Sequence, residues 1–219
     1  MDLFFSPTRS CLASRITAYE SGVQLNFIEV DLVTGRTSDG GKYLEISPLM
    51  RVPALRLDDG FLLTEETAIL QHLAAPSIAS NLAPLSGPDV DRLHQWLRMV
   101  GADLLEAVSA PLPDRQAAGS TAHRREFVLA TLEFLNDRLE QRNFLLSRFS
   151  VADAYLCSVL NGSASTRIDL SPWPAFEAYC DRMIERPSVS RAIAAELALQ
   201  NAEMTRHDSH GETSYRECA

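Results

Sequence analysis

The sequence is poor in the features that mark secreted, membrane-embedded and zinc-binding chains. Its four cysteines are far apart, with no C-x-x-C motif and no cysteine–histidine cluster: Cys11, Cys157, Cys180 and Cys218. This spacing argues against a disulfide framework and a structural zinc site, and it fits a reducing cytoplasm. The first residues do not show the pattern of a secretory signal, which is a basic segment followed by an apolar stretch. No apolar run approaches the ~20 residues that span a bilayer. We therefore expect a cytoplasmic protein without membrane association.

Positive charge is also scarce. The chain holds 20 Lys and Arg against 29 Asp and Glu, which gives a net charge of −9. Proteins that bind nucleic acid need a surplus of positive charge, so the balance argues against such a partner. The 219 residues, 46% of them hydrophobic, are enough for one large or two small globular domains.

The most informative stretch is the first turn of the chain. Residues 3–5 predict a short apolar strand, and Pro7 predicts a turn after it. The spacing of apolar residues over 12–19 predicts an amphipathic helix. Ser10 and Cys11 stand side by side where this helix begins. Unpaired N–H groups and a partial positive charge at a helix N-terminus favour the anionic form of a nearby thiol or hydroxyl. This turn is therefore a candidate place to hold a sulfur nucleophile, either the protein's own or that of a bound cofactor.

The rest of the first 77 residues alternates between strand and helix patterns. Residues 27–32 predict a second strand, and the polar, glycine-containing segment 33–42 predicts a loop. Residues 52–57 and 61–63 predict a hairpin around an Asp-Gly turn, and a helix opens at Thr64. The predicted order is β-α-β-(α)-β-β-α, which is that of a small α/β domain.

Everything after the first domain is predicted to be helical. Residues 77–88, which contain Pro84, Gly87 and Pro88 and show no periodicity, form the expected linker. The predicted helices lie near 88–110, 121–142, 150–162, 174–185 and 188–203. The division is then an α/β domain at 1–77, an all-helical domain at 88–204 and a frayed polar tail at 205–219. Ser150 and Asp153 predict a capping box, in which the serine hydroxyl accepts from the N–H three residues on and the aspartate reaches back.

Short motifs in a fixed order carry a family resemblance over nearly the whole chain. They are Ser6-Pro7 with Leu12-Ala13, Ser47-Pro48 before Val52-Pro53-Ala54-Leu55, Leu63-Thr64-Glu65 with Ala68-Ile69, the segment from Phe149 to Tyr155, and Glu185-Arg186-Pro187. In this arrangement the chain resembles the cytosolic glutathione S-transferases, and among them the bacterial beta class. The resemblance implies a thioredoxin-like α/β domain (βαβαββα) followed by an all-α domain. It also implies glutathione as cosubstrate and a homodimer formed through the third and fourth helices.

The resemblance assigns glutathione-binding roles to two places in the α/β domain. It implies a cis peptide bond between Val52 and Pro53, which leaves the backbone of Val52 free to pair with the peptide ligand. Glu65 and Glu66 fall at a helix N-terminus that suits the γ-glutamyl carboxylate. The family carries a small Ser or Gly at position 66, whereas a charged Glu66 would repel that carboxylate. Either the Glu66 side chain turns out to solvent, or glutathione binds weakly.

Two candidate catalytic residues compete for the first turn. The beta-class cysteine falls at Ser10, and the thiol is displaced to Cys11. Because neighbours on a helix point about 100° apart, both side chains cannot face the ligand equally. Ser10 can donate a hydrogen bond to the glutathione thiolate, whereas Cys11 can pack as a small buried apolar side chain, and we favour Ser10. Arg9 is a candidate cation for an anionic substrate or a glutathione carboxylate.

Further positions depart from the beta-class pattern. The beta-class lysine after the second strand falls at Gly35, with Arg36 beside it as a candidate replacement. The beta-class asparagine on the fourth helix falls at Arg98, which we count among the candidate ligand-binding residues. The His-Lys pair further along falls at Leu105-Glu106. These differences predict a remodelled pocket for the second substrate.

The favoured function is a glutathione transferase in which Ser10 stabilises the glutathione thiolate for attack on a small electrophile. Two alternatives stay open. The Arg9-Ser10-Cys11 sequence partly resembles the zeta class, which isomerises maleyl compounds by reversible thiol addition. Glu66, Gly35 and the Leu105-Glu106 pair would also suit a non-catalytic scaffold or regulatory protein that keeps the fold without its chemistry.

Overall fold

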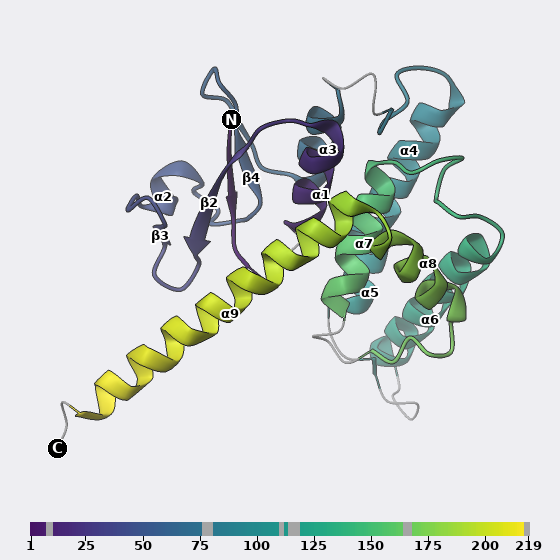
Figure 1. Cartoon of the computed structure of the whole chain (residues 1–219). Coiled ribbons are helices and arrows are strands. Elements are labelled where there is room, and N and C mark those ends of the chain that lie inside the picture. The colour runs from purple at the N-terminus through teal and green to yellow at the C-terminus, as the bar shows by residue number, and fades with distance from the viewer. Residues whose placement is uncertain (8–10, 76–80, 110–111, 114–118, 164–167, 217–219) are drawn as a thin grey trace.

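The computed structural model describes residues 1–7, 11–75, 81–109, 112–113, 119–163 and 168–216, with backbone alone for residues 163 and 203–216. An α/β unit near the N-terminus packs beside a helical unit, and the last helix runs along both (Figure 1). No helix in the described part of the chain combines the length and the apolar character needed to cross a membrane.

The α/β unit is built on one mixed sheet. Its strands are β1 (Asp2–Phe5), β2 (Asn26–Asp31), β3 (Arg36–Thr37), β4 (Ala54–Arg56) and β5 (Leu62–Leu63), in the spatial order β3-β2-β1-β4-β5. The central β1 runs parallel to β2 and antiparallel to β4. The predicted order of elements along the chain is confirmed apart from the added β3, and so is the hairpin at Asp59-Gly60. The sequence missed β3, because two residues are too few to show the alternating pattern of a strand.

Three helices complete the α/β unit. They are α1 (Leu12–Ser21), α2 (Tyr43–Ile46) and α3 (Glu66–Ala74). α1 and α3 lie together on the face of the sheet that meets the helical unit, whereas α2 lies beside the β3 edge (Figure 1). Ile69 and Leu73 of α3 are fully buried against Leu3 and Leu55 of the sheet. This packing fixes where α3 begins relative to the first turn of α1.

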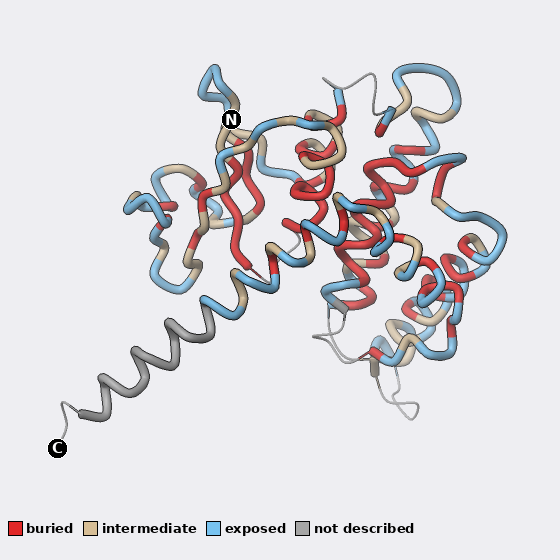
Figure 2. The backbone as a smooth tube through the Cα atoms, viewed as in Figure 1, coloured by how far each residue is buried: buried red, intermediate tan, exposed pale blue. Residues whose placement is uncertain are grey.

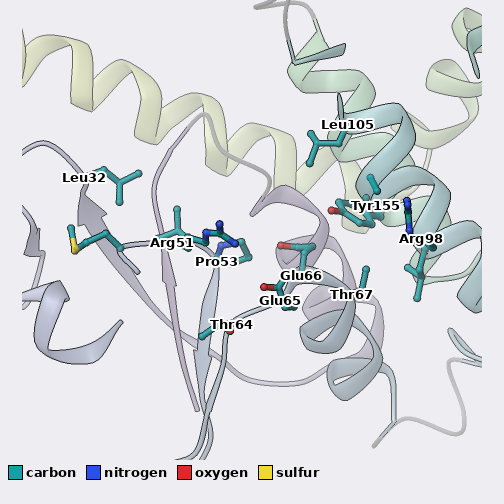
Figure 3. Close-up of a pocket in the computed structure, with 15 residues that line it drawn as sticks. Leu32, Arg51, Pro53, Thr64, Glu65, Glu66, Thr67, Arg98, Leu105 and Tyr155 are labelled. Atoms are coloured by element: carbon teal, nitrogen blue, oxygen red, sulfur yellow. The ribbon is translucent and has the colours of Figure 1, made fainter. Parts of the chain in front are cut away.

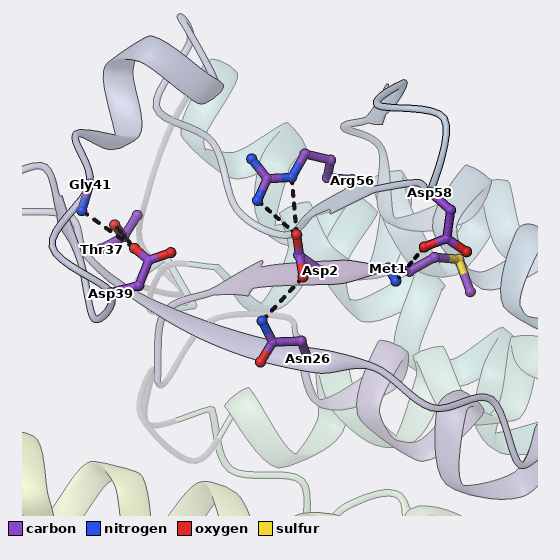
Figure 4. A network of polar contacts seen from close by, with 8 residues as sticks. All are labelled: Met1, Asp2, Asn26, Thr37, Asp39, Gly41, Arg56 and Asp58. Carbon is purple, nitrogen blue, oxygen red and sulfur yellow. Dashed lines mark hydrogen bonds and ion pairs between the residues drawn. The ribbon is translucent and has the colours of Figure 1, made fainter.

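Asp2 ties the central strand to both of its neighbours (Figure 4). The Arg56 guanidinium of β4 donates two hydrogen bonds to Asp2 Oδ2, at 3.0 and 2.7 Å, and the Asn26 amide of β2 donates to Asp2 Oδ1 at 3.1 Å. These bonds hold the pKa of Asp2 below its usual value. Asp2 and Arg56 are both partly exposed, so water screens the pair, and the buried apolar side chains contribute more to the stability of the sheet.

The helical unit surrounds one deeply buried helix. Its elements are α4 (Pro88–Arg98), the π-helical segment η1 (Met99–Leu104), α5 (Leu105–Val108), α6 (Ser120–Glu140), α7 (Val151–Ser163), α8 (Pro174–Ile184) and α9 (Pro187–Arg216). The first ten residues of α7 are all buried, and its tube is red along this part in Figure 2. The helix predicted at 88–110 is present from Pro88 to Val108, and it widens into a π-helix over Met99–Leu104.

The last helix is longer than the sequence indicates. α9 continues to Arg216, so the segment from 205 is helical through that residue and not the frayed tail that its polarity predicts. The first turns of α9 are held by buried Val189 and Ala192. Once these turns are formed, each further residue adds a backbone hydrogen bond at little entropic cost. The end of α9 extends away from the body of the molecule (Figure 1).

α1 joins the two units. Arg15 of α1 donates to Glu196 of α9 at 2.9 Å, and both side chains are only 6% exposed. The guanidinium also lies 4.1 Å from the ring centroid of Phe27. Leu12 and Ile16, on the same helix, belong to the apolar core of the helical unit. The two units are therefore packed along the helix that begins at the candidate catalytic turn.

Asp153 caps α7 in a form that differs in part from the prediction. Its carboxylate accepts from the Ser150 backbone N–H at 3.0 Å, which confirms the backward half of the capping box. The Ser150 hydroxyl, however, donates to the same carboxylate oxygen at 2.9 Å, where the sequence predicts that it accepts a hydrogen bond. The Leu145 N–H donates to the other oxygen at 2.9 Å. Burial raises the pKa of Asp153 to about 6, and these bonds oppose the shift.

Candidate active site

A cavity of about 560 Å³ opens between the two units. Its volume lies within the range typical of small-molecule sites, about 300–1,000 Å³. In Figure 3, Arg51, Pro53 and Glu65 come from the α/β unit, and Arg98, Leu105 and Tyr155 face them from the helices. The lining residues are Leu32, Met50, Arg51, Val52, Pro53, Thr64, Glu65, Glu66, Thr67, Leu97, Arg98, Gly101, Ala102, Leu105 and Tyr155.

The wall from the α/β unit offers backbone groups to a ligand. The Val52–Pro53 bond is cis, as expected, and both residues line the cavity just before β4. Glu65, with an extended backbone, is the N-cap of α3, and Glu66 and Thr67 form the first turn. The first N–H groups of a helix lack partners within it, so this end of α3 is suited to an anion. The structure therefore brings together Val52, Pro53, Glu65 and Glu66, as the sequence predicts.

The Glu66 side chain turns inward. Its Oε1 accepts from the Ser14 hydroxyl of α1 at 2.8 Å, and the residue is only 7% exposed. Its Oε2 is buried and has no hydrogen-bond partner within the described residues. Burial raises the pKa of Glu66 to about 8, although hydrogen bonds from Ser14 lower it. The first of the two alternatives for Glu66, a side chain in solvent, is therefore wrong.

Burial also changes the electrostatic argument about Glu66. The predicted repulsion of a ligand carboxylate presumes that Glu66 is ionised. A carboxyl with a pKa of about 8 is mostly protonated at neutral pH, because the low dielectric of its surroundings disfavours the charge. At that pH Glu66 adds little negative charge to this end of the cavity.

The helical wall is apolar except for Tyr155 and Arg98. The Tyr155 ring packs against Gly101 so closely that a Cβ at position 101 would lie 2.8 Å from its Cε1 and 2.9 Å from its hydroxyl oxygen. Burial, and then the charges of Glu66 and Glu65, raise the pKa of Tyr155 above its usual range. The hydroxyl therefore keeps its proton and is a hydrogen-bond donor on this wall of the cavity.

Two arginines line the cavity. Arg98 of α4 lines the helical wall, and its guanidinium donates a hydrogen bond to the Asp103 carboxylate at 3.0 Å. Arg51 lines the other wall. Arg36 does not line the cavity: it lies on the edge strand β3, and its guanidinium donates to the Gly40 carbonyl at 3.4 Å. The cation near Val52 is thus Arg51, and the predicted role of Arg36 gains no support from this geometry.

Arg51 and Tyr155 are site residues that the sequence alone did not single out. Arg51 directly precedes Val52-Pro53, so its position was a usable signal. Tyr155 is a hydroxyl-bearing residue inside an otherwise apolar helix, which a buried packing role explains equally well. Only the packing of α7 against the π-helical segment shows that this residue reaches the cavity.

The structure describes one of the two candidate catalytic residues of the first turn, Cys11. Cys11 is 1% exposed and does not line the cavity; its Sγ lies 3.9 Å from the Ser6 carbonyl oxygen. Burial raises the pKa of its thiol above the usual range, so the reactive thiolate is disfavoured. This placement matches the interpretation of Cys11 as a small buried side chain. Arg9 and Ser10 lie outside the described residues, and their roles stay predictions.

Comparison with known proteins decides the family. The family model "Glutathione S-transferase, N-terminal domain" matches residues 3–75, and the corresponding C-terminal domain model matches residues 95–187. Together these regions cover most of the chain. The chain belongs to the glutathione S-transferase family. Its relative GstA from Escherichia coli O157:H7 is 35% identical over 201 residues, which cover 90% of this chain and 98% of GstA.

Solved structures of other family members agree with this fold. A sphingomonad glutathione S-transferase, solved in complex with glutathione, is 36% identical, with a TM-score of 0.79. The beta-class glutathione S-transferase of Sphingomonas chungbukensis is 35% identical, also with a TM-score of 0.79. Each match covers 90% of this chain and 98% of the other. The predicted fold and the resemblance to the bacterial beta class are confirmed.

Proposed function

We propose that this glutathione S-transferase family member binds glutathione in the cavity between its two units and transfers it to a small electrophile. One observation carries the proposal. The cis-proline turn at Val52–Pro53 and the N-terminus of α3 meet on one wall of that cavity, in a chain that matches a glutathione-bound relative along its length. The cytoplasm, where glutathione is abundant and thiols stay reduced, is the expected place of action.

The cavity offers partners for each part of the peptide. The backbone of Val52 lies at the free end of β4 and can pair with the cysteinyl residue as an added strand does. The N-terminus of α3 receives the γ-glutamyl carboxylate, since unpaired N–H groups and the helix dipole favour an anion there. Arg51 supplies a cation on the same wall, and Arg98 supplies one opposite. We keep Arg9 as a candidate cation at the first turn.

The chemistry needs the sulfur of glutathione as a thiolate. We assign this role to Ser10, whose hydroxyl donates a hydrogen bond to the thiolate and lowers the pKa of the bound thiol. The thiolate attacks the electrophilic carbon, a carbon–sulfur bond forms, and the leaving group departs with the electron pair of the bond that breaks. Cys11 receives no catalytic role, because its thiol is buried and protonated.

The helical wall forms the electrophile side. Leu97, Ala102 and Leu105 provide an apolar surface, and the Tyr155 hydroxyl adds a hydrogen-bond donor within it. A donor in an apolar wall can hold a nitro, carbonyl or halide group of the electrophile as negative charge develops there. A small aromatic or unsaturated electrophile fits this surface.

Conjugation of glutathione to a chloronitrobenzene tests the proposal. The wild-type chain should release chloride and form the thioether, and Ser10→Ala should lower kcat by about 10²-fold, since it removes a donor to the developing charge. Glu185→Gln, an exposed change at the end of α8, is a control for handling and folding. Full activity in Ser10→Ala would remove Ser10 from the mechanism.

The alternatives give different results in the same experiments. A zeta-like isomerase would convert a maleyl compound to its trans isomer with glutathione present and would conjugate the chloronitrobenzene poorly. A non-catalytic scaffold would do neither. The homodimer expected through α3 and α4 is measured independently by light scattering on the full chain.

A further inference from the structure

Glu66 joins the proposed glutathione subsite to the first turn of α1. It is the first residue of α3 and lines the cavity, yet its carboxyl turns toward α1, where Oε1 accepts from Ser14. The side chain is more than nine-tenths buried, and its second oxygen has no partner among the described residues. An ionisable group is thus enclosed directly beside the helix end that receives a ligand carboxylate.

No cation within the described residues compensates a charge on Glu66. Among the described residues, the groups that face it are the Cys11 thiol at the N-cap of α1, the Ser14 hydroxyl of α1 and the Tyr155 hydroxyl of α7. Glu65, the N-cap of α3, precedes it and is itself acidic. The nearest cation on α1, Arg15, is bonded to Glu196.

The cations of the cavity do not supply this charge either. Arg51 and Arg98 line the cavity walls, Arg98 is paired with Asp103, and neither arginine is among the described groups that shift the pKa of Glu66. The environment therefore opposes ionisation of Glu66, and a second negative charge nearby opposes it further.

We propose that glutathione binding is coupled to protonation of Glu66, so that the cavity holds the anionic peptide while this buried carboxyl is uncharged and releases it when the carboxyl ionises. The inference rests on the proposed function. Its cause is that two carboxylates at one helix N-terminus, one of them buried, cannot both be ionised without a large electrostatic cost.

The pH range follows from the burial of Glu66. The free protein keeps the proton up to a pKa of about 8, and a bound carboxylate raises that pKa further. Affinity is therefore constant below about pH 8 and falls above it, approaching tenfold per pH unit, until the carboxyl also ionises in the complex. Binding in this range takes up a proton.

Titration calorimetry of the full chain with S-methylglutathione tests the coupling. This analogue has no thiol to ionise, and it keeps the γ-glutamyl carboxylate. Because its amino group titrates in the same range, the informative quantity is the ratio of the wild-type Kd to the Glu66→Gln Kd at each pH. We expect this ratio to be constant between about pH 6 and 7.5 and to rise about tenfold by about pH 9. Glu185→Gln, the same substitution at an exposed residue outside the cavity lining, should keep a constant ratio to wild type.

Two further measurements keep the test decisive. Glu66→Ser replaces the glutamine variant if the latter does not fold. The ratio of the wild-type Kd to the Glu66→Ser Kd should then rise with pH in the same way. Repeating the wild-type titration at about pH 8.5 in two buffers of different ionisation enthalpy should reveal proton uptake on binding. Binding with a constant ratio and no proton uptake overturns the coupling alone. Absence of binding to wild type and variants at every pH overturns the proposed function, and the coupling with it.

Discussion

Replacing Glu66 by glutamine should stabilise the protein at alkaline pH and leave its stability near pH 4 almost unchanged. Glutamine keeps the shape of the side chain and an oxygen that can accept from the Ser14 hydroxyl, which is 2.8 Å from Oε1 in the wild type. What it removes is the ionisable group. The perturbation therefore isolates the cost of placing a carboxyl in this buried position.

The magnitude follows from the pKa difference between the folded and unfolded states. The pKa of Glu66 is about 8 in the folded protein, against 4.5 for the free side chain. Below about pH 4.5 the carboxyl is protonated in both the folded and the unfolded protein. Between pH 4.5 and about pH 8 it is protonated only in the folded protein, so the free energy of unfolding falls as pH rises. The full difference corresponds to an upper limit of about 5 kcal/mol, reached above pH 8. Glutamine removes this loss.

Urea unfolding of both proteins, followed by circular dichroism between about pH 4 and 9, measures the effect. Asp153 and Glu196 also have raised pKa values, but they titrate in both proteins, so the difference between the two curves belongs mainly to Glu66. We expect Glu66→Gln to gain several kcal/mol on wild type by about pH 8, while Glu185→Gln follows wild type. Parallel curves for Glu66→Gln and wild type would refute a buried, protonated Glu66.

Three further changes test other contacts. Glu196→Ala should cost about 3–5 kcal/mol of unfolding free energy in urea, because it leaves the buried Arg15 guanidinium without its carboxylate; a loss below about 1 kcal/mol would show that this pair does not hold the units together. Gly101→Ala should lower stability by about 1–3 kcal/mol, since its Cβ meets the Tyr155 ring, and adding Tyr155→Phe should recover part of the loss; unchanged thermal melting would contradict this packing. Cys11→Ala should keep kcat/KM for glutathione conjugation within about threefold of wild type, and a large loss would restore the thiol as a catalytic group.

The parts of the structure set by local pattern were predictable from the sequence. The strands around residues 3–5 and 27–32 have clear apolar patterns, and Asp59-Gly60 marks its hairpin. The cis bond before Pro53 was implied by the family resemblance that its short motif helps to carry. These features depend on a few neighbouring residues, so one sequence is enough to indicate them.

The orientation of side chains at the site depends on residues far apart in the chain. The buried Glu66 carboxyl accepts a hydrogen bond from the Ser14 hydroxyl of α1, which lies 52 residues earlier in the chain. Tyr155 reaches the cavity because Gly101 lets α7 approach the π-helical segment closely. No local pattern indicates either contact, and of the two alternatives that the charge of Glu66 suggested, the solvent-exposed side chain was wrong.

The central claim is that the cavity between the two units binds glutathione, and calorimetric titration of the full chain with glutathione at about pH 7 tests it most directly. At that pH Glu66 is mostly protonated, so the α3 N-terminus is free to accept the γ-glutamyl carboxylate. We predict saturable binding of a single molecule per chain, with Arg51→Ala weaker than wild type and Glu185→Gln equal to it. Absence of heat at millimolar glutathione, in a chain that is folded by circular dichroism, would contradict the account.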